Sequence, residues 1–165
     1  VLYVNTEGKF PVLRLKQICG TDFEDVAKKV IVLNERDFWG ISDLVDKLLL
    51  ISPIFKMLVI DTIAKPYVDA LLSGEKGISI NVEIARQVAL LKYITEKYKL
   101  FTIIINRAQS LPSGPPTPIA GSIVSFWSDM DIRLMKSKQY RNQGFISVLN
   151  LNRVVPYQIK YRGLF

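Results

Sequence analysis

The feature that most constrains the fold is a set of apolar runs that each end in polar residues. The three runs are Leu2–Val4, Met57–Ile60 and Phe101–Ile105. Short continuous apolar runs separated by helical patterns are typical of parallel strands that are covered on both faces. Open α/β sheets bind ligands at the carboxyl ends of such strands. The sequence therefore predicts that Glu7, Asp61 and Asn106, which follow these runs, lie at one edge of a parallel sheet.

The segments between the runs carry apolar residues at helical spacing, which predicts βα units. The expected helices are Pro11–Cys19, a short piece with Phe23, Val26 and Ala27, Trp39–Ile51 and Asn81–Leu100, and Val30–Leu33 is a further expected strand. We expect Ser42 or Asp43 to cap the Trp39–Ile51 helix and Pro53 to stop it. The first four strands therefore predict a mostly parallel sheet with helices on both faces.

The last third of the chain has a different pattern. Polar and apolar residues alternate more clearly there, as they do in an antiparallel meander. The expected strands are Asp131–Met135, Phe145–Leu151 and Tyr157–Tyr161. The whole chain, 1–165, is predicted to form one α/β domain with an antiparallel C-terminal extension, because 165 residues fit one domain.

Composition excludes several classes of protein. The chain has no His and a single cysteine, Cys19, so His-based catalysis, an internal disulfide and most transition-metal sites are excluded. A lone cysteine also favours a reducing compartment, and we expect a cytoplasmic, intracellular protein. No apolar run approaches the ~20 residues that cross a bilayer, so no membrane partner is expected. The net charge of +7 suits a polyanion such as nucleic acid, or alternatively reflects a merely Lys-rich surface.

A phosphate-binding loop is missing from the sequence. No G-x-x-x-x-G-K-[ST] segment is present, so nothing here cradles a triphosphate with backbone N–H groups and a lysine. The chain also opens on Val1 inside an apolar run. We therefore expect that it is a fragment and that an N-terminal part of the protein is absent.

Motifs in a fixed order carry a resemblance to a known family. The segment Tyr3–Phe10, YVNTEGKF, resembles the Y-[IV]-D-T-E-G-x-F motif of the RecA/RadA recombinase family, and Leu58–Thr62 resembles its Walker B strand. Further segments are similar to the family's G-R-G-E-L-S, T-N-Q, P-I-G-G-N and T-R-L motifs: Gly74–Ser79, Ile105–Arg107, Pro118–Ser122 and Ile132–Leu134. The likeness covers nearly the whole chain. It implies a RecA-like three-layer sandwich whose phosphate-loop strand and helix are missing, most like an archaeal RadA paralogue.

Departures from the family pattern favour a paralogue over the strand-exchange recombinase itself. Asn5 stands where the family motif has an acid, and Arg107 replaces the glutamine that senses the γ-phosphate. The loop after Arg107, Gln109 to Gly121, is short and holds Pro112, Pro115, Pro116 and Pro118 instead of being long and glycine-rich. No N-terminal helix-hairpin-helix domain is present.

The resemblance implies roles for the three residues at the sheet edge. Glu7 would orient the water that attacks a γ-phosphate, and Asn106 would position that nucleophile or sense the phosphate. Asp61 would hold Mg²⁺ through water. The alternatives are a capping or solvated acid at Glu7, a helix cap at Asp61 and a simple turn residue at Asn106. Without a phosphate loop none of them can act on ATP, so ATP and Mg²⁺ are cofactors expected of the intact protein and none is expected on this chain.

Basic residues on segments that resemble the family's DNA-facing loops are candidates for binding single-stranded DNA. These are Lys65, Lys76, Arg86 and Arg107. Such residues contact phosphates without reading bases. The alternative for each is a solvated surface charge.

The favoured function is a recombinase paralogue that binds DNA in homologous recombination and repair and assists a RadA-type recombinase or other paralogues. The intact protein would be a DNA-dependent ATPase only if it carries a phosphate loop. One alternative is a RadB- or KaiC-like ATPase of the same superfamily, whose substrate is not DNA. Another is a pseudo-ATPase that serves as an assembly partner, in a homo- or hetero-oligomer.

The resemblance also predicts a gap in the sheet. In this fold the phosphate-loop strand lies beside the strand that here ends at Asn106. Its absence would leave N–H and C=O groups unpaired, at about 1–3 kcal/mol for each buried group. We expect a missing N-terminal segment to fill the gap, in preference to closure of the neighbouring strands or pairing with a partner.

Overall fold

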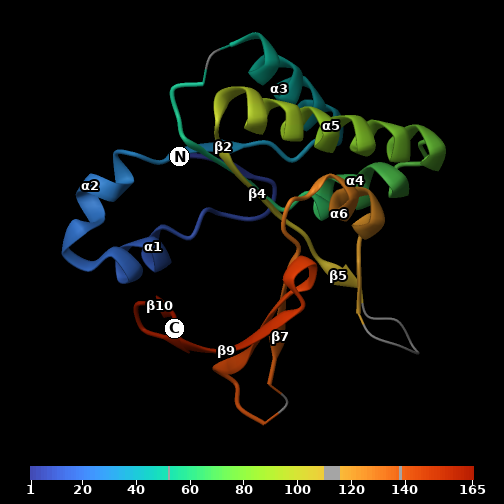
Figure 1. Cartoon of the computed structure of the whole chain (residues 1–165). Coiled ribbons are helices and arrows are strands. Elements are labelled where there is room, and N and C mark those ends of the chain that lie inside the picture. Colours follow the sequence, from blue (N-terminus) through green and yellow to red (C-terminus); the bar gives the residue numbers. More distant parts are fainter. Residues whose placement is uncertain (52, 110–115, 138) are drawn as a thin grey trace. The chain divides into compact units, whose positions relative to one another are not determined.

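The computed structural model describes residues 1–51, 53–109, 116–137 and 139–165. The chain forms two compact units, and each is built from two stretches of sequence (Figure 1). The first unit comprises Val1–Phe10 and Lys29–Trp127, and the second comprises Pro11–Lys28 and Ser128–Phe165.

The first unit is built on a parallel four-stranded sheet. Its strands are β1 (Leu2–Asn5), β2 (Ile31–Asn34), β3 (Met57–Asp61) and β4 (Phe101–Ile105), in the order β2-β1-β3-β4. The register places Asn5 opposite both Asn34 and Asp61, and Asp61 opposite Ile105. All four expected strands are therefore present, and their carboxyl ends are level with one another.

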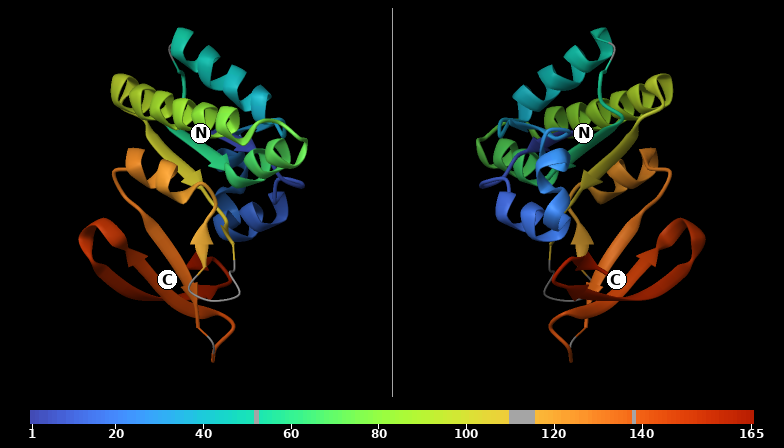
Figure 2. Two further views of the ribbon diagram at one scale, coloured as in Figure 1. Left: turned by 90° about the vertical axis from the view of Figure 1, so that its right-hand side faces the viewer. Right: turned by 90° about the vertical axis from the view of Figure 1, so that its left-hand side faces the viewer.

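Helices cover one face of this sheet. They are α3 (Phe38–Leu50), α4 (Ala64–Leu72), α5 (Gly77–Tyr98) and α6 (Gly121–Trp127), and Figure 2 shows α3 and α5 on the same side of the strands. The alternate strand residues Val4, Leu58 and Ile60 are buried beneath them. Fully buried Ile84 and Leu91 of α5 belong to the same core, which is the burial that stabilises the unit.

The helix boundaries differ from the sequence prediction in informative ways. The predicted caps Ser42 and Asp43 are wrong, because α3 begins earlier and the Asp37 side chain accepts a hydrogen bond of 2.8 Å from the Gly40 N–H. Ser42 is buried inside α3. Helices α4 and α6 were not predicted. The α4 segment contains Pro66, which is tolerated because it lies in the first turn of the helix.

The opposite face of the sheet is open at β4. Phe101, Ile103 and Ile105 point to this face and are 73%, 46% and 38% exposed. Strand β4 also ends the sheet order, so its outer edge pairs with no strand of the described residues. The α/β fold is confirmed, and within the described residues these three side chains leave one face of β4 exposed.

The segment after β4 forms a short hairpin. Strand β5 (Ala108–Gln109) pairs in antiparallel fashion with β6 (Thr117–Pro118). The predicted proline loop spans this hairpin and the residues around it. Its members Pro112 and Pro115 lie outside the described residues.

The second unit carries the antiparallel sheet predicted for the C-terminal part. Its strands are β7 (Ile132–Lys136), β8 (Gln143–Val148), β9 (Arg153–Lys160) and β10 (Gly163–Leu164), in the order β10-β9-β8-β7. Its helical parts are α1 (Val12–Cys19), a 3₁₀ turn η1 (Gly20–Asp22), α2 (Phe23–Ala27) and a second turn η2 (Leu149–Leu151). Arg14 of α1 donates to the backbone carbonyls of Lys160 and Tyr161, which ties the two stretches of the unit together. Strand β8 ends at Val148, three residues before the predicted end at Leu151, because Leu149–Leu151 form the turn η2.

No helix within the described part of the chain is long and apolar enough to cross a membrane.

Candidate functional site

The site predicted from the sequence lies at the carboxyl ends of β1, β3 and β4. These strands are neighbours in the sheet, so Glu7, Asp61 and Asn106 follow or end adjacent strands. Parallel neighbours lie about 4.8 Å apart, which brings the three side chains to one edge. The structure therefore brings together the residues that the sequence singled out, while their chemical roles stay predictions.

Two buried threonines lock the ends of β1 and β3 together. The Thr6 hydroxyl donates to the Thr62 carbonyl at 2.8 Å and accepts from the Thr62 N–H at 2.7 Å. The Thr6 N–H also donates to the Asp61 carbonyl at 2.9 Å. Both side chains are almost fully buried, so these bonds are shielded from water and fix the backbone beside Glu7 and Asp61. Sequence analysis missed this pair, although threonine after an apolar run was visible at both positions.

Glu7 is held by two partners of the first unit. The Thr62 hydroxyl donates to Glu7 Oε1 at 2.7 Å, and the Arg107 guanidinium forms an ion pair with Glu7 Oε2. The turn that presents Glu7 needs Gly8, which has a φ of +56°. The Gly8 carbonyl accepts from Asn5 Nδ2 at 3.3 Å and from Arg36 Nη2 at 3.1 Å. Both oxygens of the predicted catalytic carboxylate are thus engaged.

Asp61 ends β3 and contacts an aromatic hydroxyl that sequence analysis did not consider. The Tyr3 hydroxyl donates to Asp61 Oδ2. Burial, together with this hydrogen bond and the nearby carboxylate charge, raises the pKa of Tyr3. Tyr3 therefore stays a neutral donor at physiological pH. Its position was predictable only from register, since Tyr3 lies opposite Val59, two residues before Asp61 on β3.

Asn106 supports the segment that follows β4. Its Nδ2 donates to the Ile119 carbonyl at 2.7 Å, and its Oδ1 accepts from the Arg107 N–H at 2.8 Å. These bonds also orient the start of the β5–β6 hairpin. These contacts are those of a turn residue, which is the alternative that the sequence left open for Asn106. Its role in positioning the nucleophile or sensing the phosphate stays a prediction.

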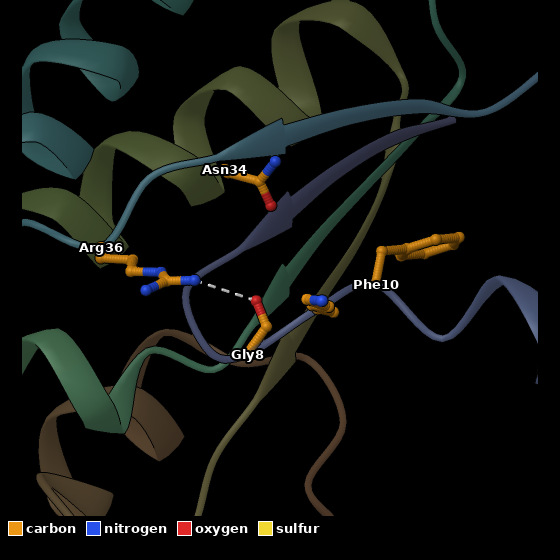
Figure 3. Close-up of a pocket in the computed structure, with 5 residues that line it drawn as sticks. Gly8, Phe10, Asn34 and Arg36 are labelled. Carbon is orange, nitrogen blue, oxygen red and sulfur yellow. Dashed lines mark hydrogen bonds between the residues drawn. The ribbon is translucent and has the colours of Figure 1, made fainter.

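A hollow lies beside the turn that carries Glu7, at the ends of β1 and β2. It is lined by Gly8, Lys9, Phe10, Asn34 and Arg36 and has a volume of about 540 Å³ (Figure 3). The Phe10 ring packs edge-on against Tyr3, with ring centroids 4.9 Å apart. The hollow is open and carries both cationic and amide groups. It continues the polar edge formed by the strand ends.

Two of the predicted DNA contacts lie in the first turn of α4 and just before α5. The Lys65 backbone N–H donates to the Thr62 hydroxyl at 3.3 Å, which places Lys65 next to Glu7, and its ammonium group pairs with Asp69. Lys76 is exposed at the start of α5 and lies in the turn between α4 and α5. Arg107 lies at the site itself through its ion pair with Glu7.

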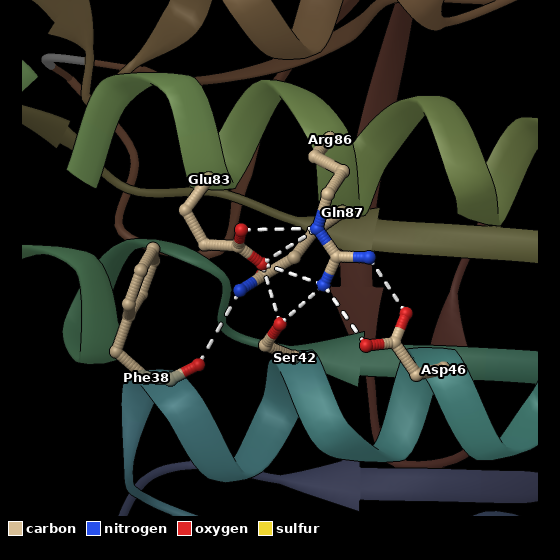
Figure 4. Close-up of polar contacts among 6 residues, drawn as sticks. All are labelled: Phe38, Ser42, Asp46, Glu83, Arg86 and Gln87. Carbon is tan, nitrogen blue, oxygen red and sulfur yellow. Dashed lines mark hydrogen bonds and ion pairs between the residues drawn. The ribbon is translucent and has the colours of Figure 1, made fainter. Parts of the chain in front are cut away.

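Arg86 has a different environment from the other predicted DNA contacts. It projects from α5 toward α3, where its guanidinium contacts Asp46, Glu83 and Ser42 (Figure 4). The bonds to Asp46 are bidentate, at 2.6 and 3.1 Å. Two carboxylates and a hydroxyl of the protein thus bind the Arg86 guanidinium, so we leave Arg86 out of the DNA contacts proposed below.

The groups around Arg86 shift one another's ionisation. Hydrogen bonds to Glu83 and Asp46 raise the pKa of Arg86. The hydrogen bond from Arg86 lowers the pKa of Asp46. Burial alone would raise the pKa of Glu83, but hydrogen bonds from Arg86 and Ser42 outweigh it and lower that pKa. The cluster is therefore a charged, paired contact between α3 and α5.

The residues at the strand ends fit Mg²⁺ held through water. Within the described ranges no group of three or more acidic or cysteine side chains could cage a metal ion. Mg²⁺ bound beside phosphates needs only one or two carboxylates and keeps several waters. Asp61 supplies such a carboxylate, since Tyr3 contacts only its Oδ2. The donor set thus suits a Mg²⁺–phosphate ligand better than a dedicated metal centre.

Comparison with known proteins finds relatives in archaea. The chain is 28% identical over 138 residues to the DNA repair and recombination protein RadB of Methanocaldococcus jannaschii, covering 82% of this chain and 65% of that protein. It is 29% identical over 146 residues to the protein of the same name from Methanosphaera stadtmanae, covering 82% and 60%. The chain thus spans somewhat less than two thirds of these relatives. No family model matches the chain.

A solved structure shares the fold. The crystal structure of the RadB recombinase matches with a TM-score of 0.77 at 21% identity, over 99% of this chain and 76% of that one. The predicted resemblance to a RadA paralogue of the RecA family is confirmed, and the matched paralogue is RadB.

Proposed function

We propose that this chain, a relative of RadB within the RecA superfamily, is the core of a DNA repair and recombination protein. Among the functions predicted from the sequence, the RadB-like alternative has the better support, because the matched relatives carry that name. Its expectation of a substrate other than DNA has no such support, because those relatives are named as DNA repair and recombination proteins. The observation that carries the proposal is the placement of Glu7, Asp61 and Asn106 at the ends of three adjacent parallel strands.

These residues have separate tasks in the proposed ATPase. ATP bound with Mg²⁺ would supply the phosphoanhydride bond that is hydrolysed. Glu7 would accept a hydrogen bond from the attacking water and orient it, since each carboxylate oxygen can accept a second hydrogen bond beside the one from Thr62 or Arg107. Asp61 would hold Mg²⁺ through water, and the Tyr3 hydroxyl, which donates to Asp61 Oδ2, orients that carboxylate. Asn106 keeps Arg107 and the following hairpin in place.

The open edge of β4 supports a further part of the proposal. Its unpaired edge and the exposed Phe101, Ile103 and Ile105 suit an added strand followed by an apolar helix. We assign this place to a segment of the same protein that carries the phosphate loop. The relatives extend beyond the matched part by more than a third of their length, which leaves room for such a segment.

DNA binding is proposed through Lys65, Lys76 and Arg107. All three belong to unit one, and Lys65 and Arg107 lie beside Glu7. Bound single-stranded DNA would then contact the residues next to the ATPase site. Because such contacts are made to phosphates, the affinity should fall steeply with salt. A RadA-type recombinase, another paralogue or a second copy is the proposed protein partner.

One observation favours the pseudo-ATPase alternative. Arg107 pairs with Glu7 and Thr62 donates to its other oxygen, so the carboxylate has no oxygen without a partner. A carboxylate neutralised in this way is a poor acceptor for water. If Arg107 stays in place when nucleotide binds, the protein would bind ATP without turnover and serve in assembly.

The decisive experiment uses the intact protein with its phosphate loop. Glu7→Gln should abolish ATP hydrolysis and spare ATP binding, while Glu24→Gln, on exposed α2, should leave both unchanged. Arg107→Gln should raise turnover if the ion pair restrains Glu7. Hydrolysis that is unchanged in Glu7→Gln would remove Glu7 from the mechanism, and absence of hydrolysis in both the wild type and Arg107→Gln would favour the pseudo-ATPase.

A further inference from the structure

Lysines precede three of the four strands in the first unit. Lys29 lies two residues before β2, Lys56 one residue before β3 and Lys99 two residues before β4. All three side chains are exposed. Because the strands are parallel, these lysines lie at the amino-terminal edge of the sheet, at the opposite end of the strands from Glu7, Asp61 and Asn106.

The sheet order fixes the spacing of the lysines. Strands β2 and β4 are the outer strands and are separated by three intervals, or roughly 14 Å at about 4.8 Å per interval. Lys56 lies between them, and its carbonyl accepts from the Phe101 N–H at 3.0 Å. A strand of β3 length spans roughly 17 Å at about 3.3 Å per residue, which separates this row from the ATPase site.

Aromatic side chains accompany the lysines where α5 ends. Lys97 Nζ lies 5.6 Å from the centroid of the Tyr93 ring and 5.0 Å from that of Tyr98. Tyr93 is 52% exposed. A hydrogen bond with Tyr98 and the nearby Tyr93 raise the pKa of Lys97, so its charge is secure at physiological pH.

The acidic residue that directly precedes Lys97 already has a basic partner. Glu96 lies in the last turn of α5, and it pairs with Lys92. Lys99, in a left-handed conformation with a φ of +52°, directs the chain from α5 into β4. This conformation sets the backbone at Lys99, and the residue is exposed.

From this arrangement we propose that Lys29, Lys56, Lys97 and Lys99, with Tyr93, form a second binding surface for single-stranded nucleic acid. We call it the lysine edge. Lysines neutralise phosphates, and exposed rings stack on bases without regard to sequence, which is the chemistry of non-specific single-strand binding. The inference rests on the proposed DNA-binding function and extends it to a surface remote from the loops assigned above.

The test compares two variants of the whole chain that each lose three positive charges. The edge variant carries Lys56→Gln, Lys97→Gln and Lys99→Asn, the last because asparagine tolerates the left-handed conformation. The loop variant carries Lys65→Gln, Lys76→Gln and Arg107→Gln. Binding to a fluorescein-labelled oligothymidylate is measured by anisotropy over a range of salt, and circular dichroism checks that both variants are folded.

The salt dependence reports the number of phosphates contacted. For the edge variant we expect weaker binding and a slope of log K against log salt that is shallower by about 2, at about 0.7 for each lost phosphate contact. Lys56, Lys97 and Lys99 of the wild type should also be protected from acetylation in the saturated complex. If the edge variant does not fold, protection of these lysines from acetylation in the wild-type complex still tests the lysine edge.

The outcomes separate the two proposals. An unchanged slope in the edge variant, or full acetylation of the three lysines in the complex, overturns the lysine edge. If the loop variant binds more weakly at the same time, the proposed function stands without it. A wild-type chain that fails to bind at low salt overturns DNA binding at both surfaces. Protection of the edge lysines with an unaffected loop variant supports the edge and removes the loop assignment.

Discussion

Replacing Arg86 with alanine tests whether this residue stabilises the fold or binds DNA. The sequence pattern assigned Arg86 to DNA, whereas its guanidinium contacts Asp46, Glu83 and Ser42 between α3 and α5. We expect Arg86→Ala to lower the free energy of unfolding and to leave the affinity for single-stranded DNA unchanged under conditions where the protein stays folded.

The size of the loss follows from the exposure of each partner. The pair with Asp46 joins side chains that are 39% and 48% exposed, so solvent screens it and it contributes about 1 kcal/mol at most. The Glu83 side chain is only 14% exposed, and removing its charged donor leaves it poorly solvated, at a cost of about 1–2 kcal/mol. The total is about 2 kcal/mol, or a fall in Tm of roughly 6 °C for a chain of this size.

The sign of the pH dependence provides a second readout. The pKa values of Asp46 and Glu83 are lower in the folded chain than their ordinary values of 3.8 and 4.5. Their contribution to stability is therefore present above those values and is lost as the pH falls through the lower, folded values. Arg86→Ala should lack this part of the acid sensitivity, so the two urea midpoints should approach each other as the pH falls below the ordinary pKa values of these carboxyl groups.

The assay is urea unfolding followed by circular dichroism, together with oligonucleotide anisotropy. Lys65→Ala is the matched control, because it removes an exposed pair with Asp69, and it should cost less than about 0.5 kcal/mol. Arg86→Lys should recover only part of the stability, since an ammonium group cannot make the bidentate contact. A fully stable Arg86→Ala with much weaker DNA binding would refute the structural argument.

Three further substitutions test the packing. Gly144→Ala would place a Cβ 2.1 Å from the Met135 carbonyl, so we expect a loss of about 1–3 kcal/mol and early melting of the second unit, measured by hydrogen exchange of its amides; protection equal to wild type would contradict this. Thr6→Val removes the acceptor of the Thr62 N–H and should cost about 1–3 kcal/mol in urea unfolding, whereas Thr6→Ser should retain most of the stability. Leu58→Ala, at a site with no exposed surface, should cost about 2–5 kcal/mol, and a loss below 1 kcal/mol would mean that the core relaxes around it.

The local patterns that were predicted correctly are those set by short-range chemistry. Phe101–Ile105 is apolar apart from Thr102, and it forms β4 with the predicted bounds. The Asn81–Leu100 pattern belongs to α5, although the helix begins at Gly77 and ends at Tyr98. Helix ends are harder to predict from sequence, because the cap depends on the backbone conformation of one residue. In α3 the cap is Asp37, whereas the sequence pattern predicted Ser42 or Asp43.

The roles of polar residues were harder to predict than their positions. Arg86 and Arg107 are equivalent by charge, yet one joins two helices and the other reaches Glu7 from a residue 100 positions away in the chain. Nothing in either local sequence distinguishes them. A partner contributed by another element is set by the sheet order and by register, which are tertiary properties.

The sequence by itself determined the four parallel strands, the three longer antiparallel strands and most helices, and it placed two acids and an amide at strand ends, because these follow from periodicity and strand polarity. It did not predict the two-residue strands β5, β6 and β10. Only the tertiary structure decided the order β2-β1-β3-β4, the contacts that hold Glu7 and Asp61, the open face of β4 and the row of lysines at the opposite edge. The physical reason is that pairing and packing join residues far apart in the chain, and the free energy of those contacts belongs to both partners together.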